Sequence, residues 1–317
     1  MKNILKMLNG QRGNIIILVA LSMVILIGLS AIVIDGGRMY SEKSNLQKAV
    51  DAAAIAGAQL LPQDSVNAGT VAEQIALANI SDANVTINVE ITDNNSAIRV
   101  TALSNVQFAL AKVLNAADTD IKAAAKVIVF PLSSYQGRGI VPFGIDLTKY
   151  SDIDEMNQGD LVQLKWGDSE SGNFGPLNID GSGANNYRNT LINGSEREIK
   201  VGDIIDTETG NMAGPTEDLN IRFENDNWHQ GEDVLTHVSN HESCPRIVLV
   251  PIYQPLEDND RQVKQVEITG FASIFITEIR STGNDKGVDG VYLERTYSGA
   301  GSSLQQNFGT YGYILVE

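Results

Sequence analysis

Zinc coordination is the chemistry that the residue types of this chain suggest first. All three histidines and the only cysteine lie between residues 228 and 244. Zinc prefers imidazole and thiolate ligands at short spacings, and His237, His241 and Cys244 follow the pattern H-x3-H-x2-C. The alternative is a polar surface loop that holds these residues by chance, and we favour it. We therefore predict no bound metal or other cofactor and keep these three residues as the candidates for a metal site.

A second group of polar residues imitates the first half of a calcium loop. Asn178, Asp180 and Ser182 precede Gly183, but the position at which such loops carry a bidentate glutamate holds Asn189. We therefore interpret this segment as a tight turn. The acidic run at residues 257–260 is interpreted as a solvated loop, with weak calcium binding as the alternative.

The sequence gives little evidence of a catalytic site. It contains no G-x-S-x-G, no H-E-x-x-H, no P-loop and no G-x-G-x-x-G after an expected strand. A cysteine nucleophile at Cys244, with His237 or His241 as its base, is the one alternative that can be named. We predict that the protein is not an enzyme and assign no catalytic residue.

The first structural element that the sequence indicates is a helix, formed by an uncharged apolar run from residue 15 to residue 34. Twenty helical residues span about 30 Å, which is the thickness of the hydrocarbon core of a bilayer. The alternatives are a cleaved signal peptide and a buried helix of a soluble protein. The run is longer than a signal-peptide core, and Asp35 follows it instead of a cleavage site. We predict a retained transmembrane helix at residues 15–35.

The charges on either side of this run predict its orientation. Lys2, Lys6 and Arg12 precede it without any acidic residue, so residues 1–14 are expected to form a cytoplasmic tail, with the rest of the chain outside the cytoplasm. The formal net charge of −16 argues against nucleic acid as a partner. The single cysteine excludes an intramolecular disulfide.

Beyond the apolar run, the sequence predicts that the helix continues into water as far as Pro62. Gly36 and Gly37 mark a weak point or hinge in it, because glycine is unfavourable inside a helix. Apolar and small residues recur at helical spacing after this pair, as in a helix that packs against a partner. The predicted interaction residues are Leu46, Val50, Ala53, Gly57 and Leu60.

Three pieces of this region together resemble a known family. They are R-G-N at residues 12–14, D-G-G-R at residues 35–38 and L-Q-K-A-V-D-A-A-A at residues 46–54. The segment is similar to the N-terminal region of the TadG-like proteins of the tight-adherence (Flp) pilus-assembly system. The resemblance implies a single-pass, non-enzymatic component of the bacterial cell membrane that assembles or anchors a pilus. Its implied partners are the bilayer and other pilus-assembly or pilin-like subunits, bound through the N-terminal helix.

The sequence departs from two features of related proteins. Type IV-like prepilins are cut after a glycine and carry glutamate five residues later, whereas Leu18 stands five residues after Gly13. We therefore expect the helix to stay uncut. Some TadG relatives carry an adhesion domain with a D-x-S-x-S loop, but the nearest string begins at Asp180 and ends at Ala184, so that domain is not predicted.

The expected fold class is α+β, with a TadG-like domain at residues 36–131 and a mostly β extracytoplasmic domain at residues 132–317. The first domain should contain the long helix packed on a small sheet, with a second helix capped by Asp64 or Ser65, a hairpin, a short helix from Gln107 to Leu114 and a third strand closed by Pro131. The second should consist of strands and long loops. The expected strands are at residues 85–91, 98–102, 121–129, 199–205, 246–253, 262–279, 288–296 and 311–316.

Two other functions remain open at this point. One is a general surface or adhesion protein unrelated to pili, and the other is a metal-dependent envelope hydrolase. The sequence leaves open whether the protein enters the fibre or only anchors it. It also leaves open the identity of its partners, the ligand of the distal domain and the oligomeric state.

Overall fold

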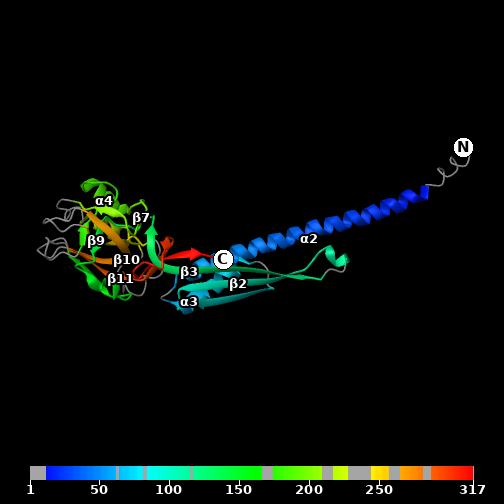
Figure 1. The fold of residues 1–317 in the computed structure, drawn as a ribbon, viewed down its shortest axis with the longest axis horizontal. Coiled ribbons are helices and arrows are strands. Elements are labelled where there is room, and N and C mark those ends of the chain that lie inside the picture. The colour runs from blue at the N-terminus through cyan, green and yellow to red at the C-terminus, as the bar shows by residue number, and fades with distance from the viewer. Residues whose placement is uncertain are drawn as a thin grey trace, which may run out of the picture.

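A single long helix, α2, organises the computed structural model of this protein (Figure 1). It spans Arg12–Ala58, 47 residues, and passes through Gly36 and Gly37 without a break. Its last turn tightens through i→i+3 bonds at Leu60 and Leu61, as expected for a helix end. The structure describes residues 12–61, 64–80, 84–114, 117–165, 174–208, 217–227, 244–256, 265–280 and 287–316.

A second helix, α3 (Ser65–Asn79), packs antiparallel to the end of α2 after a short connection. The Asp64 side chain accepts a hydrogen bond from the Asn67 backbone N–H at 3.1 Å, which confirms Asp64 as the N-cap. Three fully buried alanines of α3 recur at a spacing of four residues and let the two helices approach closely. These alanines are Ala68, Ala72 and Ala76.

The two helices cover one face of a first sheet. Its main path has the order β1-β2-β3-β14-β12, and β13 and β7 pair with β3. The turn between β1 and β2 places Asp93, Asn94 and Asn95 in the left-handed region, which these short polar residues tolerate better than most. The expected hairpin is therefore confirmed. The strands are β1 (Val85–Thr92), β2 (Ala97–Val106), β3 (Thr119–Tyr135), β14 (Thr310–Leu315), β12 (Arg295–Tyr297), β13 (Ala300–Gly301) and β7 (Ile199–Lys200).

A second sheet forms the larger body at the end of the molecule away from the start of α2 (Figure 1). Its main path has the order β5-β11-β10-β9-β4-β6, with β8 paired to β10. The strands are β5 (Leu161–Lys165), β11 (Gly287–Leu293), β10 (Gln265–Arg280), β9 (Ile247–Pro255), β4 (Phe143–Asp146), β6 (Phe174–Pro176) and β8 (Ile204–Asp206). Short helices fill the connections: η1 (Ala111–Leu114), η2 (Ser151–Asp154), α4 (Ala184–Asn193), η3 (Glu217–Leu219) and α6 (Asn220–Glu224).

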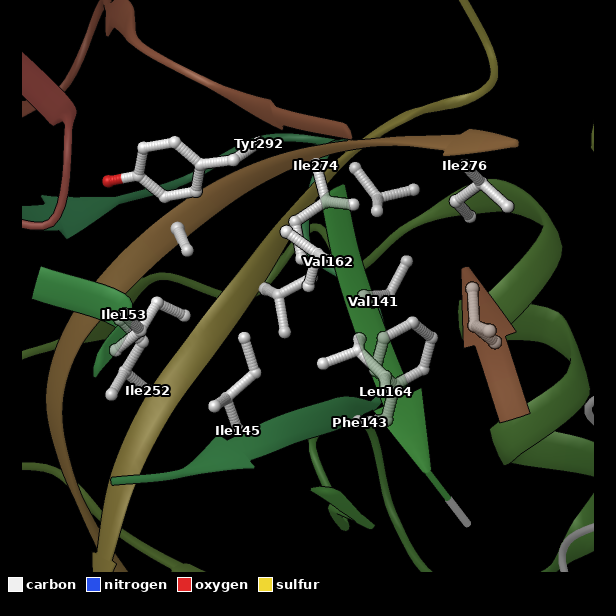
Figure 2. Packing of buried hydrophobic residues seen from close by; sticks show 14 of the residues in the cluster. Val141, Phe143, Ile145, Ile153, Val162, Leu164, Ile252, Ile274, Ile276 and Tyr292 are labelled. Atoms are coloured by element: carbon white, nitrogen blue, oxygen red, sulfur yellow. The ribbon is translucent and has the colours of Figure 1, made fainter. Parts of the chain in front are cut away.

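The core of this second body is built from large aliphatic and aromatic side chains. Figure 2 shows Phe143, Leu164 and Ile274 directed toward a common interior between their strands. Each is at most 1 % exposed. Burying a side chain of this size contributes about 1.5–3 kcal/mol, so this cluster is a main source of the stability of this body. The observed architecture is α+β, as predicted.

The chain passes between the two bodies more than once. β3 continues past Pro131 to Tyr135, although a strand closed by Pro131 was expected. Pro131 has no N–H to donate to the sheet, but its carbonyl accepts the Ser302 N–H at 2.9 Å. Near the C-terminus β14 returns to the first sheet, where Tyr311 lies opposite Pro131. The first sheet therefore includes a strand from the far end of the sequence.

Candidate interaction site on the long helix

The first half of α2 is an exposed apolar rod. Between residues 15 and 34 its large aliphatic side chains are open to the surroundings, with Ile16 71 % and Val33 73 % exposed. Among the described residues, α2 is the one helix long and apolar enough to cross a membrane. Ser22 and Ser30 do not interrupt this apolar surface, because each hydroxyl donates to the carbonyl four residues earlier, at 2.8 Å.

The apolar rod ends at Asp35, whose side chain is buried under a distant part of the chain. Its carboxylate accepts three backbone hydrogen bonds: from the Ala109 N–H at 2.8 Å, the Leu110 N–H at 3.1 Å and the Ala111 N–H at 2.7 Å. Free N–H groups at the start of a helical turn form a natural site for a carboxylate. Asp35 thereby fixes the connection between β2 and β3 onto α2, and η1 contacts this part of the helix.

The described part of this connection, residues 107–114 and 117–118, is called the hairpin tip below. It is closed by Asp118, whose carboxylate accepts the Phe108 N–H at 3.2 Å and pairs with Lys112 at 3.4 Å. The sequence predicted a short helix from Gln107 to Leu114, whereas the structure has the shorter 3₁₀ helix η1. The bonds from Asp35 take up the N–H groups just before and at the start of η1. The predicted strand that follows is confirmed as β3.

A polar pocket of ≈ 310 Å³ lies beside the hairpin tip. Arg38 and Glu42 of α2 line one side of it, about one and two helical turns beyond Asp35. The Glu42 carboxylate accepts the Ser104 hydroxyl of β2 at 3.0 Å, a second tie between the helix and the hairpin. The other lining residues are Asn84, Asn105, Val106 and Gln107.

The predicted interaction stripe on α2 faces the interior of the protein. Leu46, Val50 and Ala53 are at most 1 % exposed, and they lie in one cluster with α3 and the first sheet. Leu60 packs against the same cluster. The helical spacing did predict a packed face, but this face is covered by the same chain. Leu46, Val50 and Ala53 are thus buried within their own domain, against α3 and the first sheet.

Gly57 shows how closely the stripe is packed. A Cβ atom at this position would lie 2.5 Å from Ile98 Cδ1 and 2.9 Å from the carbonyl oxygen of Ala68. Only glycine leaves enough room for α3 and the sheet to approach the helix here. The small residues of this region therefore serve helix and sheet packing within the domain.

The zinc candidates divide between described and undescribed parts of the chain. His237 and His241 lie outside the described residues, whereas Cys244 is described and 4 % exposed. Within the described residues, no three His, Cys, Asp or Glu side chains gather closely enough to hold a metal ion. Burial raises the pKa of the Cys244 thiol, which disfavours the thiolate that both a nucleophile and a zinc ligand require.

Two buried arginines beside Cys244 serve the packing of the second body. The Arg246 guanidinium lies 4.3 Å from the ring centres of both Phe223 and Phe275, and it pairs with the Asp226 carboxylate at 3.4 Å. The Arg222 guanidinium donates to the carbonyls of Leu191 and Pro245, and burial lowers its pKa to about 10. Both cations tie loops and strands together.

The calcium-like segment forms a turn in which the carboxylate of Asp180 is already engaged. Its two oxygens accept hydroxyl hydrogen bonds from Thr190 at 2.6 Å and Ser195 at 2.7 Å. Gly181 and Gly183 have positive φ values of 106° and 104°, which suit a tight turn. The acidic run at residues 257–260 lies outside the described residues.

Two features of this site escaped the sequence interpretation: the capping role of Asp35 and the position of the hairpin tip. The available signal was the composition of the tip, F-A-L-A-K-V-L, which is unusually apolar for a connection between two strands. No local pattern indicates that this connection reaches back to the end of the apolar run.

Comparison with known proteins identifies the α2 region. Residues 13–60 match the sequence model of the Flp pilus-assembly TadE/G-like family. The match covers the apolar rod, Asp35 and the packed stripe, and it ends with the helix. No curated protein and no solved structure matches the chain. The part beyond residue 60 is therefore described by its own structure alone.

Proposed function

We propose, from the TadE/G-like segment at residues 13–60, that this protein is a membrane-anchored component of a Flp (Tad-type) pilus assembly or envelope-anchoring system. In this proposal residues 1–14 lie in the cytoplasm, residues 15–35 cross the membrane, and both sheets lie outside. The protein acts by contacts with other subunits and catalyses no reaction. The observation that carries the proposal is the coincidence of the family match with an exposed apolar helix of membrane-spanning length.

The geometry of α2 supports a specific mechanical role. The helix leaves the apolar region without a break and enters the core of the first domain, where Leu46 and Val50 are fully packed. Asp35 and Glu42 add two polar ties to the hairpin. A force applied to the extracytoplasmic domains would therefore be transmitted to the membrane span through a continuous, braced helix.

In this mechanism the exposed apolar half of α2 is the surface through which other subunits in the membrane contact the protein. Other membrane helices of the system can contact it within the bilayer, where a small residue such as Gly28 permits close approach. A Cβ atom at Gly28 would meet no other atom of the chain within 4 Å, which is consistent with an open face. We propose this face, in place of the buried stripe, as the contact with pilin-like subunits.

A deletion and complementation experiment in the native host tests the function. We expect that loss of the protein reduces surface pili, and that the full-length protein restores them and co-purifies with pilus-assembly subunits from native membranes. A variant with Gly28→Leu should stay in the membrane but lose at least part of this co-purification. Gly36→Ala is the matched control, because the structure leaves equal free space at Gly36. Normal pili in the deletion strain would contradict the proposal and favour a general surface protein.

A further inference from the structure

We propose that the hairpin tip is a second membrane contact that rests in the outer interfacial layer of the bilayer beside the span. This inference depends on the proposed membrane anchoring and adds to it a defined position of the first domain on the membrane surface. The occupant of the apolar surface of the tip is the lipid itself. The tip would therefore contact the boundary between the acyl chains and the head groups of the lipids.

The depth of the tip follows from its bonds to α2. The N–H groups of Ala109, Leu110 and Ala111 bind the carboxylate of Asp35, the first residue after the apolar run. Ala31 lies one turn before Asp35 on the same helix face, about 5.4 Å deeper, and it is only 2 % exposed in an otherwise exposed stretch. η1 contacts α2, and the hydrogen bond from its first residue, Ala111, places it at Asp35, so the tip reaches the end of the apolar run.

The composition of the tip suits this depth. Eight of the ten residues at positions 108–117 are alanine, leucine, valine or phenylalanine, and the only charged one is Lys112. A connection that faced water alone would be expected to be polar. Lys112 is 47 % exposed at its side chain and can reach the head-group layer, as lysine does near the ends of membrane segments.

The residues at the base of the tip and beside it form the polar layer that such a position requires. The pocket beside the tip is lined by Arg38, Glu42, Asn84, Asn105, Val106 and Gln107, and Arg38 lies one turn above Asp35. The apolar tip would thus lie at the level of the acyl chains, and the polar pocket would lie at the level of the head groups. The first domain would then have two supports on the membrane, α2 and the hairpin tip, and its tilt would be restricted.

Spin labels at single cysteines in lipid nanodiscs test this position. In the full chain with Cys244→Ser, one label is placed at Ala109 in the tip, one at Leu26 in the span and one at Leu304 in the second body. Leu26 and Leu304 are 61 % and 91 % exposed, so both tolerate a label. The nanodiscs contain phosphatidylcholine and phosphatidylglycerol, and the readout is the ratio of collision rates with oxygen and with a water-soluble nickel chelate.

We expect the oxygen-to-nickel ratio at Ala109 to be several-fold higher than at Leu304 and closer to that at Leu26. A ratio at Ala109 equal to that at Leu304, with Leu26 in lipid, would overturn the tip contact and leave the anchor intact. A water-like ratio at Leu26 would overturn the anchoring itself. Lys112→Cys provides a second label position in the tip, and we expect a ratio between those of Ala109 and Leu304. A ratio at residue 112 equal to that at Leu304 would argue against the proposal.

Discussion

The Asp35 carboxylate and the Ala111 backbone N–H are joined by a 2.7 Å hydrogen bond, although 76 residues separate them in the sequence. This bond connects the first residue after the apolar run to the hairpin between β2 and β3. Two further N–H groups, those of Ala109 and Leu110, bind the same carboxylate. One side chain therefore binds three consecutive N–H groups of the hairpin tip to α2.

Replacing Asp35 should release the hairpin tip. In Asp35→Asn, one of the two acceptor oxygens becomes an NH₂ group and the negative charge is lost, so the three N–H groups cannot all remain bound. We expect amide hydrogen exchange at residues 109–111 to become about tenfold faster or more, while the cores stay folded. The measurement is hydrogen exchange with mass spectrometry on the full chain in detergent.

Asp120→Asn is the matched control for this experiment. Asp120 lies in the same hairpin, on β3, and accepts only an exposed side-chain bond from Asn105 at 2.7 Å. This variant should leave exchange at residues 109–111 unchanged. Equal protection of these amides in wild type and Asp35→Asn would show that Asp35 does not hold the tip.

Gly57→Ala should destabilise the first domain. The added methyl group would lie 2.5 Å from Ile98 Cδ1 and 3.0 Å from the Ala72 Cβ, so the helix and its neighbours must separate. Overpacking of this kind costs about 1–3 kcal/mol, which exceeds the gain of up to about 1 kcal/mol from helix propensity. We expect a lower thermal unfolding midpoint, measured by circular dichroism.

Gly37→Ala provides the matched control within the same helix. A Cβ atom at Gly37 meets nothing within 4 Å, so the substitution changes only the helix propensity. The thermal unfolding midpoint should therefore stay the same or rise. If both variants unfolded at the same temperature, the close packing around Gly57 would not contribute to stability.

Local patterns predicted the elements whose signals are contained within a few residues. Asp64 is one of the two cap candidates that the sequence indicates, and the structure selects it over Ser65. The alternating residues around the turn at residues 93–96 predict the hairpin, and the β9 and β10 runs predict strands. α4 was missed, although Tyr187, Thr190 and Leu191 are buried at helical spacing, because the polar and glycine-rich surroundings indicated loops.

Long-range relationships were not predictable in the same way. The packed stripe at Leu46, Val50 and Ala53 was recognised as a buried face, but periodicity cannot distinguish the chain's own sheet from another subunit. The bond between Asp35 and Ala111 and the pairing of β14 with β3 join segments far apart in sequence, so no local signal carries them.

Removing β14 should unfold the first sheet as well as shorten the chain. β14 pairs with β3 from Tyr311 to Leu315 and lies parallel to β12, so it fills the place between these two strands. A chain that ends at Gly309 would leave the β3 edge unpaired and would uncover part of the core that Tyr311 closes. We expect rapid proteolysis of the region at residues 64–135 in limited digestion.

A chain that ends at Leu315 is the control for this truncation, since it keeps every residue of β14 that pairs with β3. It should resist protease as the full chain does. Resistance of the chain that ends at Gly309 would mean that residues 36–131 form a domain that is stable without the C-terminal strand.

The thiol of Cys244 should react slowly in the folded protein and quickly after unfolding. Burial raises its pKa, so less thiolate is present at pH 8 in the native state than in an unfolded chain, whose thiol has a pKa of about 8.5. Above that pH the unfolded state binds fewer protons than the native state, so the stability of the second body should fall as the pH rises.

Reaction of the Cys244 thiol with a chromogenic disulfide at pH 8, with and without guanidinium, measures the difference in reactivity. A cysteine at Leu304, which is 91 % exposed, gives the rate for an open thiol in a Cys244→Ser background. Equal native rates at both positions would contradict the burial of Cys244.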